Sequence, residues 1–141
     1  MIIAIRISSL VGVPYDTKDT LFRLRLRRKY TAILLKSSAE NLNLLRKLRD
    51  YVAYGEISKE MLLELIAKRA KTIGNKKEKI DAKKIMENLD KKNLESQGIK
   101  PFFRLHPPRG GIMAKKHFGV SKGILGDNKD KINDLVRRML W

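Results

Sequence analysis

Cysteine is absent from this chain of 141 residues. Its absence excludes disulfide frameworks, thiolate nucleophiles and zinc sites built on cysteine. No apolar run approaches the roughly 18 residues that a transmembrane helix needs. The opening MIIAIRISSLVGVPYD resembles a signal peptide only superficially, because Arg6 interrupts the apolar run and neither a basic start nor a cleavage motif is present. We therefore expect a cytoplasmic protein that does not enter membranes.

Acidic residues are missing from one long segment, since no Asp or Glu occurs between Ser96 and Gly126. This segment holds six of the nine glycines and three of the four prolines, which predicts a loop. The whole chain carries a formal net charge of +17, which favours nucleic acid as a partner. A loop this basic needs a polyanion to order it, because phosphates neutralise its mutual repulsion. We expect residues 104–126 to be mobile in the free protein.

Apolar patterning predicts three strands and several helices. The strands are expected at residues 2–7, 31–35 and 51–57, the last interrupted by Gly55. Helices are expected after a Ser37-x-x-Glu40 capping box, between Ser58 and Gly74, from Asp81 onward, and over residues 132–140 with Asn128 or Asp130 as the cap. Residues 21–30 alternate like a strand but also fit a helix, which the candidate caps Asp16 and Thr17, the preceding loop and the lack of β-branched residues favour. The alternation of strand and helix fits a parallel α/β unit or a two-layer α+β sandwich.

A catalytic constellation cannot be assembled from these residues. The only histidines, His106 and His117, lie in the predicted loop without a carboxylate nearby to orient them. A two-metal nuclease would need clustered acids, which the sequence does not present. We therefore expect no catalytic residue, no metal site, no cofactor and no small-molecule substrate. The histidines are either surface residues of the loop or groups that bond to phosphate or stack on a base.

Two basic clusters are the candidate binding regions. The first is the arginine-rich stretch at residues 23–29, for which a solvated helix face and a membrane-surface helix are the alternatives; Phe22 alone is a thin apolar anchor for a membrane. The second is the acid-free segment, where glycines allow close backbone approach and Arg109 offers a bidentate fork. A flexible linker is the alternative there, but a plain linker would not lack every acid. We expect Arg104 and Arg109 to matter more than the lysines of residues 75–93, which alternate with carboxylates.

The predicted RNA-binding residues come from both clusters and from the last helix. They are Lys18, Arg23, Arg25, Arg27, Arg28, Lys29, Arg104, His106, Arg109, Lys115, Lys116, His117, Lys122, Arg137 and Arg138.

Four blocks of sequence resemble the universal ribosomal protein thirty family of the large subunit, called L-seven in eukaryotes. They are RISSLVGVPYDTKDTLFRLRLRRKY (6–30), DYVAYGEI (50–57), RLHPPRGGIMAKKHF (104–118) and INDLVRRML (132–140). RLHPPRGG is the most specific of these motifs. The bacterial members correspond to about the first 57 residues, and the long basic arm of eukaryotic members is missing, so the archaeal form is the nearest likeness. The lysine-rich residues 75–93 match no part of the pattern.

The resemblance implies an α+β fold. Its core is a ferredoxin-like βαβαβ unit over residues 1–57, with an antiparallel three-stranded sheet, two helices on one face and a helix over residues 17–29. Residues 58–141 would be an extension of helices, the basic loop 96–126 and a C-terminal helix. The implied role is a structural, non-enzymatic component of the large ribosomal subunit in the cytoplasm. The implied partners are large-subunit rRNA, 5S rRNA and neighbouring ribosomal proteins. The alternatives are a free RNA chaperone or RNA-binding regulator, and a nucleic-acid enzyme, which would need the catalytic cluster that is lacking.

Overall fold

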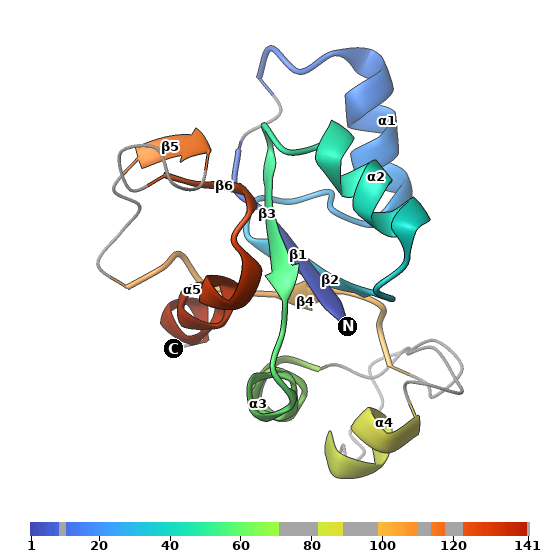
Figure 1. Cartoon of the computed structure of the whole chain (residues 1–141), viewed down its shortest axis with the longest axis vertical. Coiled ribbons are helices and arrows are strands. Elements are labelled where there is room, and N and C mark those ends of the chain that lie inside the picture. Colours follow the sequence, from blue (N-terminus) through green and yellow to red (C-terminus); the bar gives the residue numbers. More distant parts are fainter. Residues whose placement is uncertain (9–10, 71–81, 89–98, 110–113, 118–122, 141) are drawn as a thin grey trace.

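The structure is a computed structural model, and it describes residues 1–8, 11–70, 82–88, 99–109, 114–117 and 123–140. Its elements follow one another along the chain as in Figure 1. In order they are β1 (Ile2–Arg6), α1 (Tyr15–Arg23), β2 (Thr31–Leu35), α2 (Ala39–Lys47), β3 (Val52–Glu56), α3 (Lys59–Arg69), α4 (Ala82–Asn88), β4 (Phe103–Arg104), β5 (Ala114–His117), β6 (Gly123–Asp127), a 3-10 turn (Lys129–Lys131) and α5 (Ile132–Met139).

The sheet is mixed, and among the described residues its strand order is β4-β2-β1-β3-β6-β5. The central strand β1 pairs antiparallel with β2 and with β3, which confirms the α+β fold and its three-stranded core. The extension widens this core on both sides. β4 joins β2 in antiparallel register, and β6 joins β3 in parallel register before pairing with β5.

Both faces of the sheet are covered, and alternation along the strands decides which residues face which layer. Ile2 and Ala4 pack on one face with Leu21 of α1 and Leu45 of α2, so the two helices expected on one face are confirmed. Ile3, Ile5 and Ile7 point to the other face, where α3 and α5 of the extension cover them. Figure 1 shows the two helix pairs on opposite sides of the strands. Burying each isoleucine stabilises the fold by about 1.5–3 kcal/mol.

Gly55 is explained by how closely the extension approaches β3. A methyl group at this position would lie 2.4 Å from the Lys129 carbonyl oxygen and 2.9 Å from Ile132 Cβ. A strand glycine of this kind lets another stretch of backbone approach closely. The glycine that interrupts the apolar pattern therefore leaves the space in which the start of α5 packs on β3, and it does not break the strand.

Several local predictions were wrong. The expected helix at 17–29 begins at Tyr15 with Pro14 as its cap and ends at Arg23, and it has no side-chain cap. Ser38, one residue after the expected Ser37, caps α2 by accepting a hydrogen bond from the Asn41 N–H. By contrast, Ser58 caps α3 as expected, accepting from the Met61 N–H.

The C-terminal half also departs from expectation. Residues 96–126 were expected to be a loop, yet β4, β5 and most of β6 lie in this range. Neither Asn128 nor Asp130 caps the last helix, because a 3-10 turn precedes it and the Asn128 amide instead donates to the Gly126 carbonyl at 3.1 Å. Gly74, Asp81 and the two ends of the lysine-rich stretch, residues 75–81 and 89–93, lie outside the described residues, whereas its central part forms α4.

Candidate nucleic-acid interface

The arginine-rich stretch is a loop after α1 and not a continuation of the helix. The Leu26 N–H donates to the Leu21 carbonyl at 2.9 Å, and the Arg25 N–H donates to the Phe22 carbonyl at 3.0 Å. These two bonds form a Schellman motif, which ends a helix with one residue in the left-handed region. That residue is Arg25, with φ of 65°. Leu21 and Leu26 are both fully buried, the apolar contact that accompanies the motif.

The buried residue Arg6 holds this loop in place through hydrogen bonds to its backbone. Its side chain is 3% exposed, and its guanidinium donates to the carbonyls of Ser8, Leu26 and Arg27. Its own carbonyl accepts from the Tyr30 N–H at 2.7 Å. Burial lowers the pKa of Arg6 from its ordinary value. Hydrogen bonds to a buried cation are strong, so Arg6 determines the path of the loop and leaves the other arginines to point outward.

β4 brings the second basic cluster to the same place. Thr31 of β2 lies opposite Arg104 of β4, and Ala32 lies opposite Phe103. The segment before β4 adds Phe102, which packs half-buried against the core layer under α1 and α2. Residues about seventy positions apart in the sequence therefore meet at one edge of the sheet.

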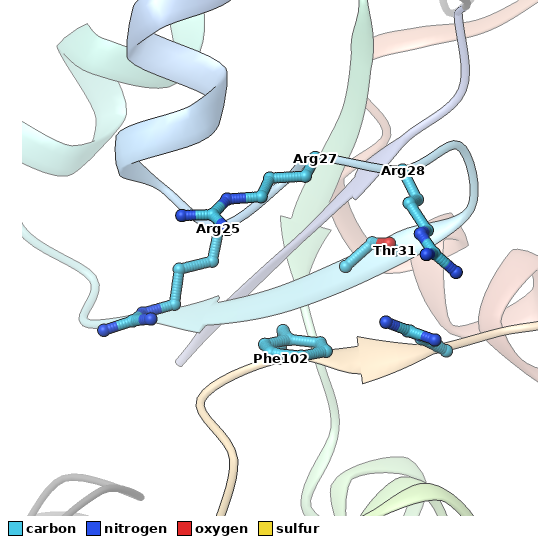
Figure 2. Close-up of a pocket in the computed structure, with 6 residues that line it drawn as sticks. Arg25, Arg27, Arg28, Thr31 and Phe102 are labelled. Carbon is cyan, nitrogen blue, oxygen red and sulfur yellow. The ribbon is translucent and has the colours of Figure 1, made fainter.

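These residues enclose a pocket of about 210 Å³. Its lining consists of Arg25, Arg27, Arg28, Thr31, Phe102 and Arg104. In Figure 2, Thr31 lies between the loop carrying Arg27 and Arg28 and the ring of Phe102. The guanidinium carbon of Arg104 lies 5.8 Å from the centroid of that ring, a cation–π contact. We call this the arginine pocket.

Among the residues that the structure describes, none that lines the arginine pocket carries a negative charge. Its lining contains four arginines and no carboxylate. Among the residues that the structure describes, no carboxylate forms an ion pair with Arg27, Arg28 or Arg104. Four neighbouring cations repel one another, so the site favours an anion that can receive several forked hydrogen bonds, which is the chemistry of phosphate.

A second basic surface forms where the segment after β4 meets the end of α5. The His106 N–H donates to the Met139 carbonyl at 3.1 Å, and the Arg109 N–H donates to the Arg138 carbonyl at 3.0 Å. The Arg138 Nε returns a bond to the Arg109 carbonyl at 2.9 Å. The two intervening prolines have no N–H to leave unpaired. We call this region, with Arg109, Arg137 and Arg138, the α5-end surface.

The remaining predicted residues that the structure describes are not part of the lining of the arginine pocket. Arg23 forms an i, i+4 ion pair with Asp19 at 3.1 Å on α1, the helix that also carries Lys18. Lys29 lies over the Tyr30 ring at 5.2 Å. Lys115, Lys116 and His117 are on β5, and Lys122 falls outside the described residues.

Sequence reasoning missed three residues of the site, namely Arg6, Thr31 and Phe102. Arg6 could have been suspected, because it is the one charge in an otherwise apolar strand. Nothing in the local pattern marks Thr31 or Phe102, since their importance comes only from the pairing of β2 with β4.

Metal and membrane sites were also sought. No group of three or more His, Asp or Glu in the described ranges is arranged to hold a metal ion. Within the same ranges, no helix is both long enough and apolar enough to span a membrane.

Comparison with known proteins gives a consistent result. The family profile described as ribosomal protein L30p/L7e matches residues 2–52. Large ribosomal subunit protein uL30 of Aeropyrum pernix is 39% identical over 155 residues, an alignment covering 96% of each chain. The protein of the same name from Methanococcus vannielii is 39% identical, covering 96% of this chain and 97% of its own. That of Pyrobaculum aerophilum is 37% identical and covers 96% and 92%.

Proposed function

This chain belongs to the ribosomal protein L30p/L7e family, and from that membership we propose that its arginine pocket and α5-end surface bind rRNA within the large ribosomal subunit. The protein is a structural component of that subunit and not an enzyme. The observation that carries the proposal is the lining of the pocket, where the described residues include four arginines and no carboxylate.

The proposed mechanism is positioning of RNA by two separated groups of cations. Arg27, Arg28 and Arg104 bind phosphates at one edge of the sheet, while Arg109 and its neighbours on α5 bind them at the other surface. Contacts to phosphate and sugar fix the register of a protein on nucleic acid without reading its sequence. Since A-form helices are recognised mainly through shape, a pair of cation groups held by one rigid sheet acts as a clamp.

The finer assignment of partners follows the same proposal. We assign large-subunit rRNA as the main partner, 5S rRNA as a second, and neighbouring ribosomal proteins as further contacts. The chain's sequence likeness to archaeal uL30 over nearly its whole length supports large-subunit rRNA, and its strong positive charge supports contact with more than one RNA strand.

Sedimentation tests the proposal against a free RNA chaperone. A lysate containing the protein is fractionated on a sucrose gradient at moderate salt, and we expect the protein to comigrate with large subunits. Recovery only at the top of the gradient would contradict a ribosomal role and favour the free RNA-binding alternative.

A charge-matched pair of variants tests the residues. The double variant R104A/R109A should weaken binding to an rRNA fragment and lower the slope of log affinity against log salt by about 1.4–1.8, the effect of two lost phosphate contacts. The control K83A/K84A removes the same charge from the exposed surface of α4. It should alter the slope far less. Equal changes in the two variants would show that net charge alone explains binding.

A further inference from the structure

We propose that the arginine pocket holds one unpaired nucleotide of its RNA, with the base against Phe102 and the adjoining phosphates on the arginines. This inference rests on the proposed function and adds the form of RNA that this site selects. The main observation is an aromatic ring inside a small basic hollow. Phosphate binding alone does not need such a ring.

The size and position of the pocket favour a single nucleotide. Its volume of about 210 Å³ is below the roughly 300–1,000 Å³ of pockets that enclose drug-sized ligands. A duplex exposes phosphates and 2′-hydroxyl groups, whereas its base faces are stacked and cannot reach a ring inside a hollow. A duplex laid across this edge would contact the arginine tips and leave Phe102 unused.

The ring and its neighbouring guanidinium together form a stacking surface. Unpaired bases stack on aromatic rings and on arginine planes, and Phe102 and Arg104 present one of each at 5.8 Å. Phe102 is half-buried against the core, so its orientation is fixed before RNA arrives. A fixed ring loses little conformational entropy on binding, which is the advantage of a preorganised site.

The polar groups of the pocket match the other parts of a nucleotide. Thr31 supplies a hydroxyl that both donates and accepts a hydrogen bond, the one neutral polar side chain in the lining. In Figure 2, Phe102 lies on one side of Thr31 and the loop of Arg27 and Arg28 on the other, and the Arg28 side chain reaches from the loop to the level of Thr31. Groups that suit a base and groups that suit a phosphate therefore line the same hollow.

The backbone at Arg25 also points to a binding role. A left-handed residue at a helix end is usually glycine, because other side chains are strained there. Here an arginine occupies that position and its side chain lines the pocket. Strained residues of this kind are found disproportionately at functional sites.

Variants at Phe102 test the inference. The binding of the full chain to a short single-stranded oligoadenylate and to a blunt RNA duplex is measured for wild type, Phe102→Leu and Phe102→Trp. Leucine keeps the apolar packing but removes the ring, so we expect oligoadenylate affinity to fall about 5- to 150-fold, the range for one stacked base, while duplex affinity changes less than about two-fold. Tryptophan keeps a ring and should preserve oligoadenylate binding.

A spectroscopic readout separates stacking from general loss of structure. In Phe102→Trp, fluorescence should be quenched by oligoadenylate beyond any change of Trp141 in the wild type. Thermal unfolding of all three proteins checks that the fold is intact. Unchanged oligoadenylate affinity in Phe102→Leu, an equal loss for duplex, or no added quenching would overturn the inference. If the protein still sediments with large subunits and R104A/R109A still lowers the salt slope, only this inference fails and the proposed function stands.

Discussion

The arginine pocket and the α5-end surface carry similar charge but are built in different ways. Three of the four pocket arginines stand on a loop whose path is fixed by the buried side chain of Arg6, and the fourth, Arg104, stands on β4. At the α5 end, backbone N–H groups of the segment after β4 bond to the last carbonyls of the helix. The pocket adds an aromatic ring and a hollow, whereas the α5-end surface offers cations together with the backbone of His106 and Arg109.

This difference in construction suggests different roles in RNA binding for two surfaces that have similar charge. Cations on an open surface can bind any phosphate within reach. Cations around a ring in a hollow bind an RNA more tightly where a base is also free to enter and stack on the ring. The comparison thus predicts a surface that contributes affinity and a pocket that contributes selectivity for RNA form.

The largest expected effect comes from breaking the support of the α5-end surface. Gly55→Ala places a methyl group 2.4 Å from the Lys129 carbonyl oxygen, which forces α5 away from β3. We expect a loss of about 3 kcal/mol in the free energy of unfolding, measured by urea denaturation. Hydrogen exchange should accelerate more in α5 than in α2.

Gly12→Ala is the control for that variant. Gly12 also has a positive φ of 74°, but no atom lies within 4 Å of the added methyl group. It should cost only about 1 kcal/mol, the backbone strain alone. A Gly55→Ala protein as stable as Gly12→Ala would show that the close contact with α5 is unimportant.

A somewhat smaller effect is expected from breaking the support of the pocket. Arg6→Met fills a similar volume but leaves the carbonyls of Leu26 and Arg27 without their donor, which should cost about 2 kcal/mol. Binding of oligoadenylate should weaken as well, although Arg6 is buried, because the loop that carries Arg27 and Arg28 is no longer held in one conformation.

Arg6→Lys tests whether geometry or charge is responsible. A single ammonium cannot reproduce the fork that reaches several carbonyls, so we expect a partial loss in both unfolding and binding measurements. Wild-type values for both would mean that the charge alone holds the loop.

The smallest effect sharpens the comparison because it acts in opposite directions on stability and binding. Arg25→Gly relieves the left-handed strain at φ of 65°, so thermal unfolding should show an unchanged or slightly raised stability, by up to about 1 kcal/mol. The salt slope of RNA binding should fall by about 0.7–0.9, one phosphate contact. Arg28→Gly, whose φ is not positive, should weaken binding without the gain in stability. Identical stability changes in the two variants would contradict a strained Arg25.

The three central strands could be predicted from the sequence because their β-branched runs are strong local signals. Residues 31–35 were located to the residue, and residues 2–7 and 51–57 to within one at each end. The helix stripes of α3 and α5 were equally clear, since their buried residues recur at helical spacing. The division of the chain after residue 57 stays a prediction, although residues from both sides share the larger core cluster.

The site was harder to predict because its geometry depends on long-range pairing. The end of α1 at Arg23 is set by a Schellman motif with arginine where glycine is usual, so no sequence signal marked it. Similarly, β4 has only two residues, too few for any alternation to appear. The two basic clusters were identified, but their meeting across β2 and β4 follows from the folded sheet and not from either segment. The expected mobility of residues 104–126 without RNA also stays a prediction.

The parallel pairing of β6 with β3 has a consequence for synthesis of the chain. β3 leaves the ribosome early, yet its second edge and one face of the sheet receive β6 and α5 only after nearly the whole sequence has been translated. Until then the nascent core carries an unpaired strand edge and exposed isoleucines, a form prone to association with other chains. We therefore expect the fold to be completed late in synthesis. Prompt addition of the final segment should limit association of the new chain with other chains.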